Sequence, residues 1–267
     1  LYCYLNSNDG RAEFLKPSAG SAQIVVNLRD LNNLTVPLPP IGEQYAIAEA
    51  LSDADDFVGS LEALIAKKRA IKQGAMQVLL LNQRRLEGFS DAWTDRTLGD
   101  LFVFKNGLNK EKSAFGVGTP IINYMDVFSS PHIKAYRVKG QVTLSHAERE
   151  NFSVRKGDVF FTRTSETVEE IGLATVLLDE IEDAVFSGFV LRARPTRMYL
   201  DGLFIGYALR SERVRRQIIA TASYTTRALT NGRLLSAVTL ALPPLSEQVA
   251  FGETLSDMDF EIGELEA

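Results

Sequence analysis

Two stretches of the chain place apolar residues at helical spacing within an otherwise polar pattern. The first runs from about residue 43 to residue 81, and its heptad-like stripe includes Ile47, Leu51, Val58, Leu61 and Ile65. The second begins at residue 244, and its stripe contains Phe251, Leu255, Met258, Ile262 and Leu265. Each pattern predicts a long helix. Gly59 and Gly74 each weaken the first by about 1 kcal/mol, which makes Gly74 a candidate point for a break.

Segment 95–243 alternates short apolar runs with turn-forming residues, a pattern typical of strands. It predicts strands over 100–104, 119–126, 154–163 (a turn, then a strand), 172–178 and 184–194. Apolar residues from Leu203 to Ala220 recur at helical spacing and predict a single helix. The combination predicts a mixed α/β fold in which a twisted mixed sheet accompanies the long helices.

An internal repeat relates the two ends of the chain. Residues 38–63 align without a gap to residues 242–267, an offset of 204. Matches continue upstream, where Leu5, Ser7, Arg11, Asn27, Arg29, Leu31 and Thr35 recur as Leu209, Ser211, Arg215, Asn231, Arg233, Leu235 and Thr239. A period this long indicates domain duplication instead of a solenoid. We therefore expect the end of one copy of a globular domain (1–37), a central helical region (38–94), a second copy of that domain (95–243) and the start of another helix (244–267).

Equivalent helices in the two copies can pair as a coiled coil between two globular parts. The alternative is that each stripe packs on its own domain. Lys67, Lys68, Arg69 and Lys72 follow the acidic first half of the first helix. They form either a solvated face or a docking surface for a partner subunit or a nucleic acid.

Composition narrows the class of protein. The chain has 267 residues, 45% of them hydrophobic and 24% charged, which excludes disorder. No apolar run is long enough to span a membrane, and no signal peptide is visible, so we expect a soluble cytoplasmic protein without a membrane partner. Because the chain starts at Leu1 and ends within a helical pattern, we expect it to be a piece of something longer.

The formal net charge of −5 argues against nucleic acid as a partner. However, residues 245–267 hold seven acids and no Lys or Arg, and removing those seven would bring the charge from −5 to +2. Segment 192–233 carries nine Arg against two acids. We interpret this local surplus as a better indicator of nucleic-acid binding than the charge of the whole chain.

Polar residues cluster where two predicted elements end. The loop 162–167 (TRTSET) follows an apolar strand, and 223–227 (SYTTR) follows the predicted helix. Arg can bond guanine, hydroxyl groups contact bases or phosphates, and Tyr can stack. The alternative is that both loops are hydrogen-bonded turns.

No catalytic constellation is apparent. His132 and His146 lack the spacing of metal ligands, so we predict no metal site, and no glycine-rich phosphate loop or nucleophile motif indicates a cofactor. Cys3, the only cysteine, is expected to be buried. Trp93 is expected to anchor the linker after the long helix to the sheet.

Several strings resemble the DNA-specificity subunits of type I restriction-modification enzymes. LPPIGEQYAIAEALSDAD, SLEALIAKKRAIKQGAMQVLL and RRLEGFSDAW resemble their central conserved region, over residues 38–93. Trp93, Leu98–Asp100 and Lys105–Gly107 resemble the start of a target-recognition domain, and GDVFFTRTSETVEEIG (157–172) resembles its middle. The second LPPLSEQ resembles the distal conserved region.

The resemblance implies two target-recognition domains, each reading one half of a split DNA sequence. It implies an antiparallel coiled coil that sets the gap between the half-sites, and partners that include double-stranded DNA, methyltransferase subunits and a translocating restriction subunit. It implies no catalysis by the subunit itself. We expect DNA contacts from Lys105, Asn106, Asn123, Tyr124, Arg163, Thr164, Ser165, Thr167, Tyr224, Thr225, Thr226 and Arg227.

The two copies differ where recognition should differ. Residues 21–23 (SAQ) occupy the register of 225–227 (TTR), whereas Asn27 and Arg29 match Asn231 and Arg233. We hypothesise that shared residues hold the fold and differing residues read different half-sites. Two other functions stay open: the specificity region of a fused methyltransferase or endonuclease, and a coiled-coil interaction protein without DNA binding.

Overall fold

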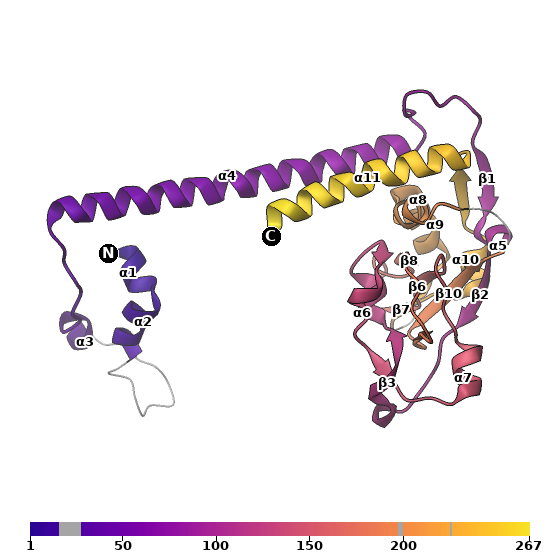
Figure 1. The fold of residues 1–267 in the computed structure, drawn as a ribbon, viewed down its shortest axis with the longest axis horizontal. Coiled ribbons are helices and arrows are strands. Elements are labelled where there is room, and N and C mark those ends of the chain that lie inside the picture. Colours follow the sequence, from indigo (N-terminus) through magenta and orange to yellow (C-terminus); the bar gives the residue numbers. More distant parts are fainter. Residues whose placement is uncertain (16–27, 197–199, 225) are drawn as a thin grey trace. The chain divides into compact units, whose positions relative to one another are not determined.

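The computed structural model describes residues 1–15, 28–196, 200–224 and 226–267 (Figure 1). It divides into two compact units, Leu1–Ala63 and Leu64–Ala267, with the boundary inside helix α4, Ile41–Leu80. This helix corresponds to the one predicted over 43–81, and it continues through Gly74 without a break. A Cβ at Gly59 or Gly74 would meet no atom within 4 Å, so neither glycine is there for close packing.

The first unit contains α1 (Tyr2–Asn6), α2 (Asn8–Leu15), α3 (Leu28–Asn32) and the beginning of α4. Ser7 turns the chain between α1 and α2, because its Oγ donates to the Tyr4 carbonyl at 2.7 Å and accepts from the Gly10 amide at 3.2 Å. A Cβ at Gly10 would lie 2.0 Å from the Tyr4 carbonyl oxygen, so this tight turn requires glycine. Among the described residues of this unit, Gly10 alone is buried. The prediction that Cys3 is buried is wrong, because the described residues around it provide no core.

The second unit is built on a five-stranded mixed sheet in the order β2-β10-β6-β8-β4. Its strands are β2 (Phe102–Asn106), β10 (Val190–Pro195), β6 (Val159–Thr162), β8 (Ala174–Leu177) and β4 (His132–Ile133). Neighbouring strands are antiparallel except for β4 and β8, which are parallel. All four residues of both β6 and β8 are buried, which explains why the central strands show apolar runs without alternation. The predicted mixed α/β fold is confirmed.

Three smaller sheets extend this framework. One has the order β5-β3-β9, with β5 (Gln141–Val142), β3 (Phe115–Ile122) and β9 (Val185–Phe186). A second has the order β11-β12-β7, with β11 (Ser223–Tyr224), β12 (Ala228–Leu229) and β7 (Thr164–Ser165). The third pairs β1 (Thr94–Thr97) with β13 (Thr239–Leu242). Short helical turns α5 (Leu98–Leu101), η2 (Lys112–Ala114), η3 (Ala135–Arg137) and α7 (His146–Asn151) connect the strands.

Three predicted elements differ from the structure. The single strand predicted over 184–194 is two strands, β9 and β10, which belong to different sheets. The strand predicted over 119–126 ends at Ile122, because Asn123 and Asp126 form a capping box that starts α6 (Tyr124–Phe128). The single helix predicted over 203–220 is two helices, α8 (Gly202–Leu209) and α9 (Glu212–Thr221). Ser211 has extended dihedral angles and is the N-cap of α9. The apolar periodicity continues across this break, so the sequence pattern does not reveal it.

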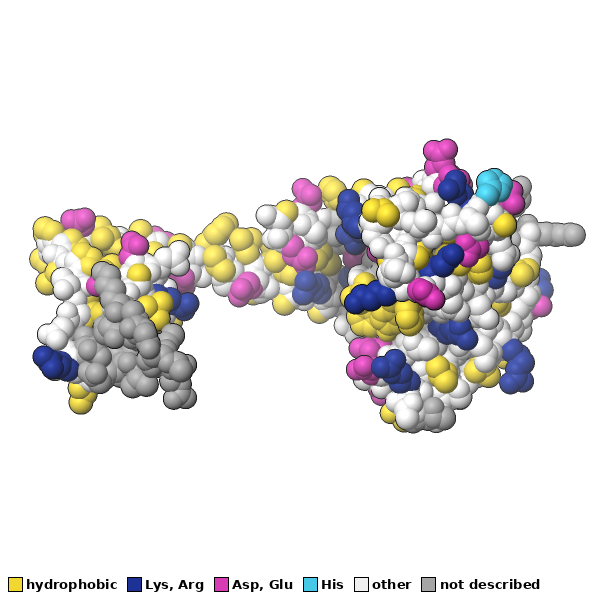
Figure 2. Space-filling view, turned by 90° about the horizontal axis from the view of Figure 1, so that it is seen from below, with side chains coloured by type: hydrophobic (Ala, Val, Ile, Leu, Met, Phe, Trp, Pro, Cys, Tyr) yellow, Lys and Arg dark blue, Asp and Glu magenta, His cyan; other side chains and the backbone are white. Residues whose placement is uncertain are grey.

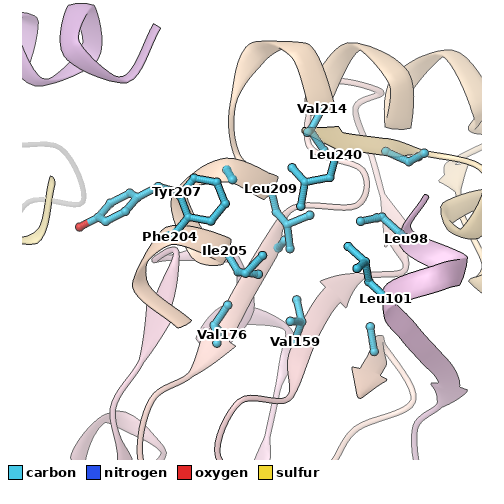
Figure 3. Close-up of a cluster of buried hydrophobic side chains, with 14 of the residues drawn as sticks. Leu98, Leu101, Val159, Val176, Phe204, Ile205, Tyr207, Leu209, Val214 and Leu240 are labelled. Carbon is cyan, nitrogen blue, oxygen red and sulfur yellow. The ribbon is translucent and has the colours of Figure 1, made fainter. Parts of the chain in front are cut away.

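The core lies where α8 packs against the sheet (Figure 3). Phe204, Ile205 and Leu209 of α8 cover Val159 and Val176 of the strands. Tyr207 extends out of this cluster with its hydroxyl at the far end (Figure 3).

On its other side, α8 packs against helix α11 (Leu245–Glu266). Trp93, expected to anchor the linker to the sheet, packs against the core cluster that includes residues of the strands. It also packs edge-on against Phe251 of α11, with 5.8 Å between the ring centroids, and Glu247 of α11 accepts its indole N–H at 3.0 Å.

The 204-residue offset recurs in the structure. Helix α3 occupies 28–32 and α10 (Gly232–Ser236) occupies the equivalent five residues, and α4 and α11 begin at the equivalent residues Ile41 and Leu245. The Gln44 side chain donates to the Pro39 carbonyl at 2.8 Å, and Gln248 donates to the Pro243 carbonyl at 2.9 Å. The repeated LPPxxEQ string thus builds the same helix start twice.

Candidate nucleic-acid interface

The strand order brings several predicted contact residues to one end of the five-stranded sheet. Strands β2 and β6 both run antiparallel to β10, so β2 and β6 finish at the same end, where β10 begins. Asn106 closes β2, and Arg163 directly follows β6. The parallel pair β3 and β9 also ends here, because the Ser187 amide donates to the Ile122 carbonyl at 2.9 Å. We call this region, formed by the described residues 105–106, 123–128, 163–170, 187–189, 223–224 and 226–229, the sheet-end surface.

A loop that leaves the sheet after β6 and returns at β8 forms the centre of this surface. Thr162 fixes both ends of the loop, because its hydroxyl donates to the Glu170 carbonyl at 3.1 Å and accepts from the Leu173 amide at 2.9 Å. Gly172 closes the loop with a φ of +61°, a conformation that favours glycine. A Cβ at this position would also lie 2.6 Å from Ile218. The sheet therefore holds residues 163–170 in a fixed position.

A hollow of about 310 Å³ lies beside this loop. Its wall combines residues from three separate segments, namely α6, the loop after β6 and the β11–β12 turn. The lining residues are Tyr124, Met125, Phe128, Thr164, Ser165, Glu166, Glu170 and Arg227. Four predicted DNA contacts (Tyr124, Thr164, Ser165 and Arg227) therefore meet at one place.

The hollow offers both hydrogen-bond donors and acceptors. Arg227 lies 3.8 Å from a carboxylate oxygen of Glu166, and both side chains are largely exposed. The Ser165 hydroxyl donates to Glu170 at 3.1 Å. Two carboxylates outnumber the one guanidinium, so this wall does not suit a phosphate group. Base edges present donors as well as acceptors, and Arg, Glu and Ser are side chains that bond them.

Aromatic side chains form the opposite wall. Tyr124 and Phe128 are stacked with 5.8 Å between ring centroids, one turn apart on α6. The Asn123 amide group is directed inward, where its nitrogen donates to the Ile121 carbonyl at 3.2 Å. Burial raises the pKa of Asp126. The hydrogen bond that its carboxylate accepts from the Asn123 backbone N–H opposes this shift. Asn123 therefore shapes α6, and Tyr124 reaches the hollow.

Lys105 turns away from the hollow. Its ammonium donates to the Asn151 carbonyl at 2.6 Å and lies over the Phe152 ring. Burial lowers the pKa of Lys105, and the neighbouring cations Arg192 and Arg194 add to this effect. Its prediction as a DNA contact rests on the sequence alone, since in the structure its ammonium contacts Asn151 and the Phe152 ring.

The remaining candidates are distributed around the same surface. Asn106, Thr167, Tyr224 and Thr226 are exposed, and Arg163 is half-buried. Tyr224 pairs with Ala228 across the β11–β12 turn. Thr225 lies outside the described residues. All twelve residues remain predicted DNA contacts.

Several arginines of segment 192–233 bind other groups of the domain, whereas their surplus in the sequence was interpreted as an indicator of nucleic-acid binding. Arg194 forms a bidentate pair with Asp158 at 2.7 and 2.8 Å, and Arg192 donates to the Ser153 carbonyl. Arg210 donates to four backbone carbonyl groups, and burial lowers its pKa to about 10. These guanidinium groups hold the fold. Lys and Arg side chains on the face shown in Figure 2 are accordingly scattered over the larger unit.

Within the second unit, α11 lies antiparallel to the C-terminal part of α4. Lys68 pairs with Glu261 at 2.6 Å, and Arg69 pairs with Glu266 at 2.7 Å. Lys72 pairs with Asp259. Cationic residues that follow the acidic part of α4 thus face the acids of α11.

A fourth ion pair closes the far end of this helix pair. Arg85 donates twice, at 2.6 Å, to the fully buried carboxylate of Glu247. The Asp259 carboxylate also accepts from the Tyr207 hydroxyl at 2.6 Å. Four of the seven acids in 245–267 therefore pair with cations within the described part of the chain, and that acidic run is largely neutralised.

The predicted coiled-coil residues fall into two groups. On α4, Ile47, Leu51 and Val58 are exposed, whereas Leu61 and Ile65 are half-buried. On α11, the residues range from fully buried to half-buried, and they are Phe251, Leu255, Ile262, Met258 and Leu265. Phe251 also packs against Phe204 of α8 with 6.1 Å between ring centroids. The α11 stripe therefore contacts the globular part as well as α4, and its role in coiled-coil pairing stays a prediction.

Sequence reasoning missed Met125, Phe128, Glu166 and Glu170 as lining residues of the hollow. No local signal marks them, because they reach the hollow through the capping box of α6 and the return of the chain to β8. Over the described ranges, no group of three or more His, Cys, Asp or Glu is arranged to hold a metal ion. None of the helices described combines the length and apolar composition that crossing a membrane requires.

Both the sequence and the fold resemble those of known proteins. Residues 1–72 match a family model described as the type I restriction modification DNA specificity domain. The chain is 23% identical over 243 residues to the EcoKI specificity subunit of Escherichia coli K12. The resemblance to type I specificity subunits is thereby confirmed.

A second curated relative is the putative MjaX specificity subunit of Methanocaldococcus jannaschii, 22% identical over 255 residues. The matches cover 86% and 89% of this chain, but only 52% and 55% of the two relatives. The chain therefore spans about half the length of the curated relatives that it matches.

Solved structures share the fold. A chain from a structure of a type I R-M system matches with a TM-score of 0.63 at 20% identity, covering 96% of this chain and 61% of its own length. The HsdS subunit from Thermoanaerobacter tengcongensis matches with a TM-score of 0.53 at 19% identity, covering 96% of this chain and 60% of that subunit. The arrangement of helices and sheets is thus that of type I specificity subunits.

Proposed function

We propose that this chain recognises a specific DNA sequence as part of a type I restriction-modification complex and performs no catalysis itself. The sheet-end surface reads one half of a split site. Methyltransferase subunits and a restriction subunit supply the chemistry, in the cytoplasm. Segments 1–37 and 95–243 belong to two recognition domains, and 38–94 and 244–267 belong to the helical spacer.

The observation that carries this proposal is the hollow beside the loop after β6. Polar side chains from three segments that are distant in the sequence converge on it, although the fold does not need an Arg, two Glu and two hydroxyl groups at one exposed place. Guanine offers two acceptors to an Arg, and cytosine offers a donor to a Glu. A wall with both kinds of group can therefore discriminate more kinds of base pair than a wall of Lys and Arg alone.

The balance of charge agrees with this assignment. The acids that make the chain negative pair largely with Lys and Arg on α4 and with Arg85. They lie on the helix pair, and they do not surround the sheet-end surface. The net charge of −5 therefore does not describe the potential that DNA would meet there.

The test is to map methylated bases in the DNA of cells that express this chain with a type I methyltransferase subunit. We expect methylation confined to one split sequence, with adenine methylated in each half. Binding of the purified assembly to duplexes with that sequence should weaken steeply as salt rises, because phosphate contacts release counterions.

Methylation without sequence preference, or no methylation in cells where the assembly forms, would overturn the proposal. DNA binding that is weak and insensitive to salt would favour an interaction protein built on the helix pair. Methyl transfer by this chain without any methyltransferase subunit would show that the chain carries catalysis itself.

A further inference from the structure

Phe189 is a large apolar residue on the sheet-end surface that the predictions from sequence did not include. It lies in the short turn between β9 and β10, and 65% of its surface is exposed. A single exposed aromatic side chain is common on protein surfaces and indicates little alone. What distinguishes Phe189 is the rigidity of the turn that presents it.

Backbone hydrogen bonds fix this turn to separate segments of the domain. The Ser187 amide donates to the Ile122 carbonyl at 2.9 Å, at the end of β3. The Gly188 amide donates to the Leu108 carbonyl at 2.7 Å, just after β2. The first two residues of the turn, Ser187 and Gly188, are therefore held by two segments that lie far from the turn in the sequence.

Phe189 itself is held by both of its backbone groups. Its amide bonds the Ser187 hydroxyl at 3.2 Å, and its carbonyl accepts from the Arg163 amide at 3.1 Å. The Arg163 carbonyl in turn accepts from the Thr230 amide at 3.1 Å. Phe189 is thus linked, through one residue, to the loop that forms the centre of the sheet-end surface.

Two glycines allow the close packing under this turn. A Cβ on Gly107 would lie 2.0 Å from the Ser187 carbonyl oxygen. A Cβ on Gly188 would lie 1.9 Å from Oδ1 of Asn109. Ser187 is itself almost completely buried. The turn is therefore packed tightly from below, while the one side chain on top of it projects into solvent.

A rigid support for an exposed apolar group favours a binding contact, because the backbone loses no further conformational entropy when the partner binds. Nearby residues are those proposed to read bases: Arg163 is bonded to Phe189, and Asn106 lies opposite Leu191 in the strand register. Among base edges, the thymine methyl group is the one that an apolar side chain recognises.

We infer that Phe189 contacts a thymine methyl group in the recognised half-site and thereby determines specificity at one base pair. This inference rests on the proposed function. Hydrogen bonds hold the backbone amide and carbonyl of Phe189 to the domain. The ring alone therefore projects from the surface to reach the methyl group. The neighbouring polar residues supply the hydrogen bonds to other bases.

The test compares Phe189→Ala with a matched control, Val103→Ala. Val103 is 60% exposed on β2 of the same sheet, but it lies three residues before Asn106, toward the opposite end of the strand. Both variants are assembled with the methyltransferase subunit and titrated with the duplex that the methylation map identifies. We expect Phe189→Ala to lose about tenfold or more in affinity and Val103→Ala to lose none.

A second measurement replaces each thymine of that duplex by deoxyuridine, one at a time. For the unmodified chain, one replacement should reduce affinity by a similar factor, and for Phe189→Ala the same replacement should have no further effect. Phe189→Leu, which keeps an apolar group, should retain part of the preference. Thermal unfolding of all three variants should match the parent, because the substituted side chains are exposed.

Unchanged affinity of a folded Phe189→Ala variant would overturn the inference, and so would lost affinity without sensitivity to any thymine methyl group. In both cases the unmodified chain still selects its sequence, so the proposed function stands. If the unmodified chain selects no sequence, the proposed function fails first, and that result is seen before any variant is compared.

Discussion

Leu51 and Leu255 occupy the same position of the 204-residue repeat, yet 39% of Leu51 is exposed and Leu255 is completely buried. The same contrast holds for Ile47 against Phe251, and for Leu31 against Leu235. Both copies carry an apolar pattern that needs a partner surface. In the second copy, the sheet of residues 95–243 and the linker after α4 provide it. Among the described residues, the first copy has no such sheet, so identical sequence signals give different burial.

The largest expected effect tests this contrast at one pair of positions. Leu255→Ala should lower the free energy of unfolding by about 3 kcal/mol, because it leaves a cavity between α11 and α8. Leu51→Ala should change it by less than about 0.5 kcal/mol, because that side chain is exposed. Urea unfolding of both variants measures the difference. Equal losses would mean that the first copy is covered as well as the second.

The second test concerns the repeated Glu of LPPxxEQ. Glu247 is buried and accepts from both Arg85 and Trp93, whereas Glu43 is exposed. Glu247→Gln should cost about 2 kcal/mol of unfolding free energy, because the partly buried Arg85 loses its counter-ion.

The matched variant Glu43→Gln should leave the unfolding midpoint within error of the parent. If it destabilised the chain as much as Glu247→Gln, the assignment of different partners to the two copies would be wrong.

A smaller effect is expected where the two copies differ in sequence. Tyr207 corresponds to Cys3, and only Tyr207 has a hydroxyl group, which donates to Asp259. Burial, together with Asp259, raises the pKa of Tyr207, so the hydroxyl stays protonated and donates at neutral pH. Tyr207→Phe should cost about 1.5 kcal/mol. Cys3→Ser should cost nothing measurable in the same unfolding assay, and a loss there would show that Cys3 is packed.

The smallest expected effect is a pH dependence within the second copy. Lys110 and Ser145 hold the pKa of Glu148 at about 2, below its ordinary value of 4.5. A lowered pKa in the folded state adds stability above pH 4.5, and this stability is lost as pH falls from 4.5 toward 2.

Glu148→Gln should therefore shift the thermal midpoint slightly at pH 7, and the shift should vanish near pH 2. A midpoint difference that grew on acidification would contradict the sign of this effect.

Local patterns predicted much of the fold. Apolar periodicity placed α4 to within two residues at its start, and short apolar runs located β6, β8 and β10. Periodicity failed at Arg210, because α8 and α9 bury the same side of the chain across a break. It also failed at Asn123, where a polar cap ended a strand that β-propensity would have continued.

The candidate site was predictable as residues but not as a cluster. Thr164, Ser165 and Arg227 were recognisable from their chemistry in the loops. Their convergence with Tyr124 depends on the pairing of β7 with β12 and of β3 with β9, over separations of about sixty residues. Such pairing leaves no local signal, and neither do the contacts that hold Arg192 and Arg194 within the domain.

The central claim is that residues differing between the copies read DNA, whereas residues shared by the copies hold the fold. The most direct measurement selects bound duplexes from a random pool, using the assembly with Arg227→Ala and, separately, with Arg233→Ala. Arg227 replaces Gln23 in the repeat, whereas Arg233 is shared with Arg29. Arg227→Ala should relax the preference at one base pair of one half-site, and Arg233→Ala should leave the selected sequence unchanged. An unchanged sequence and affinity after Arg227→Ala would contradict the claim.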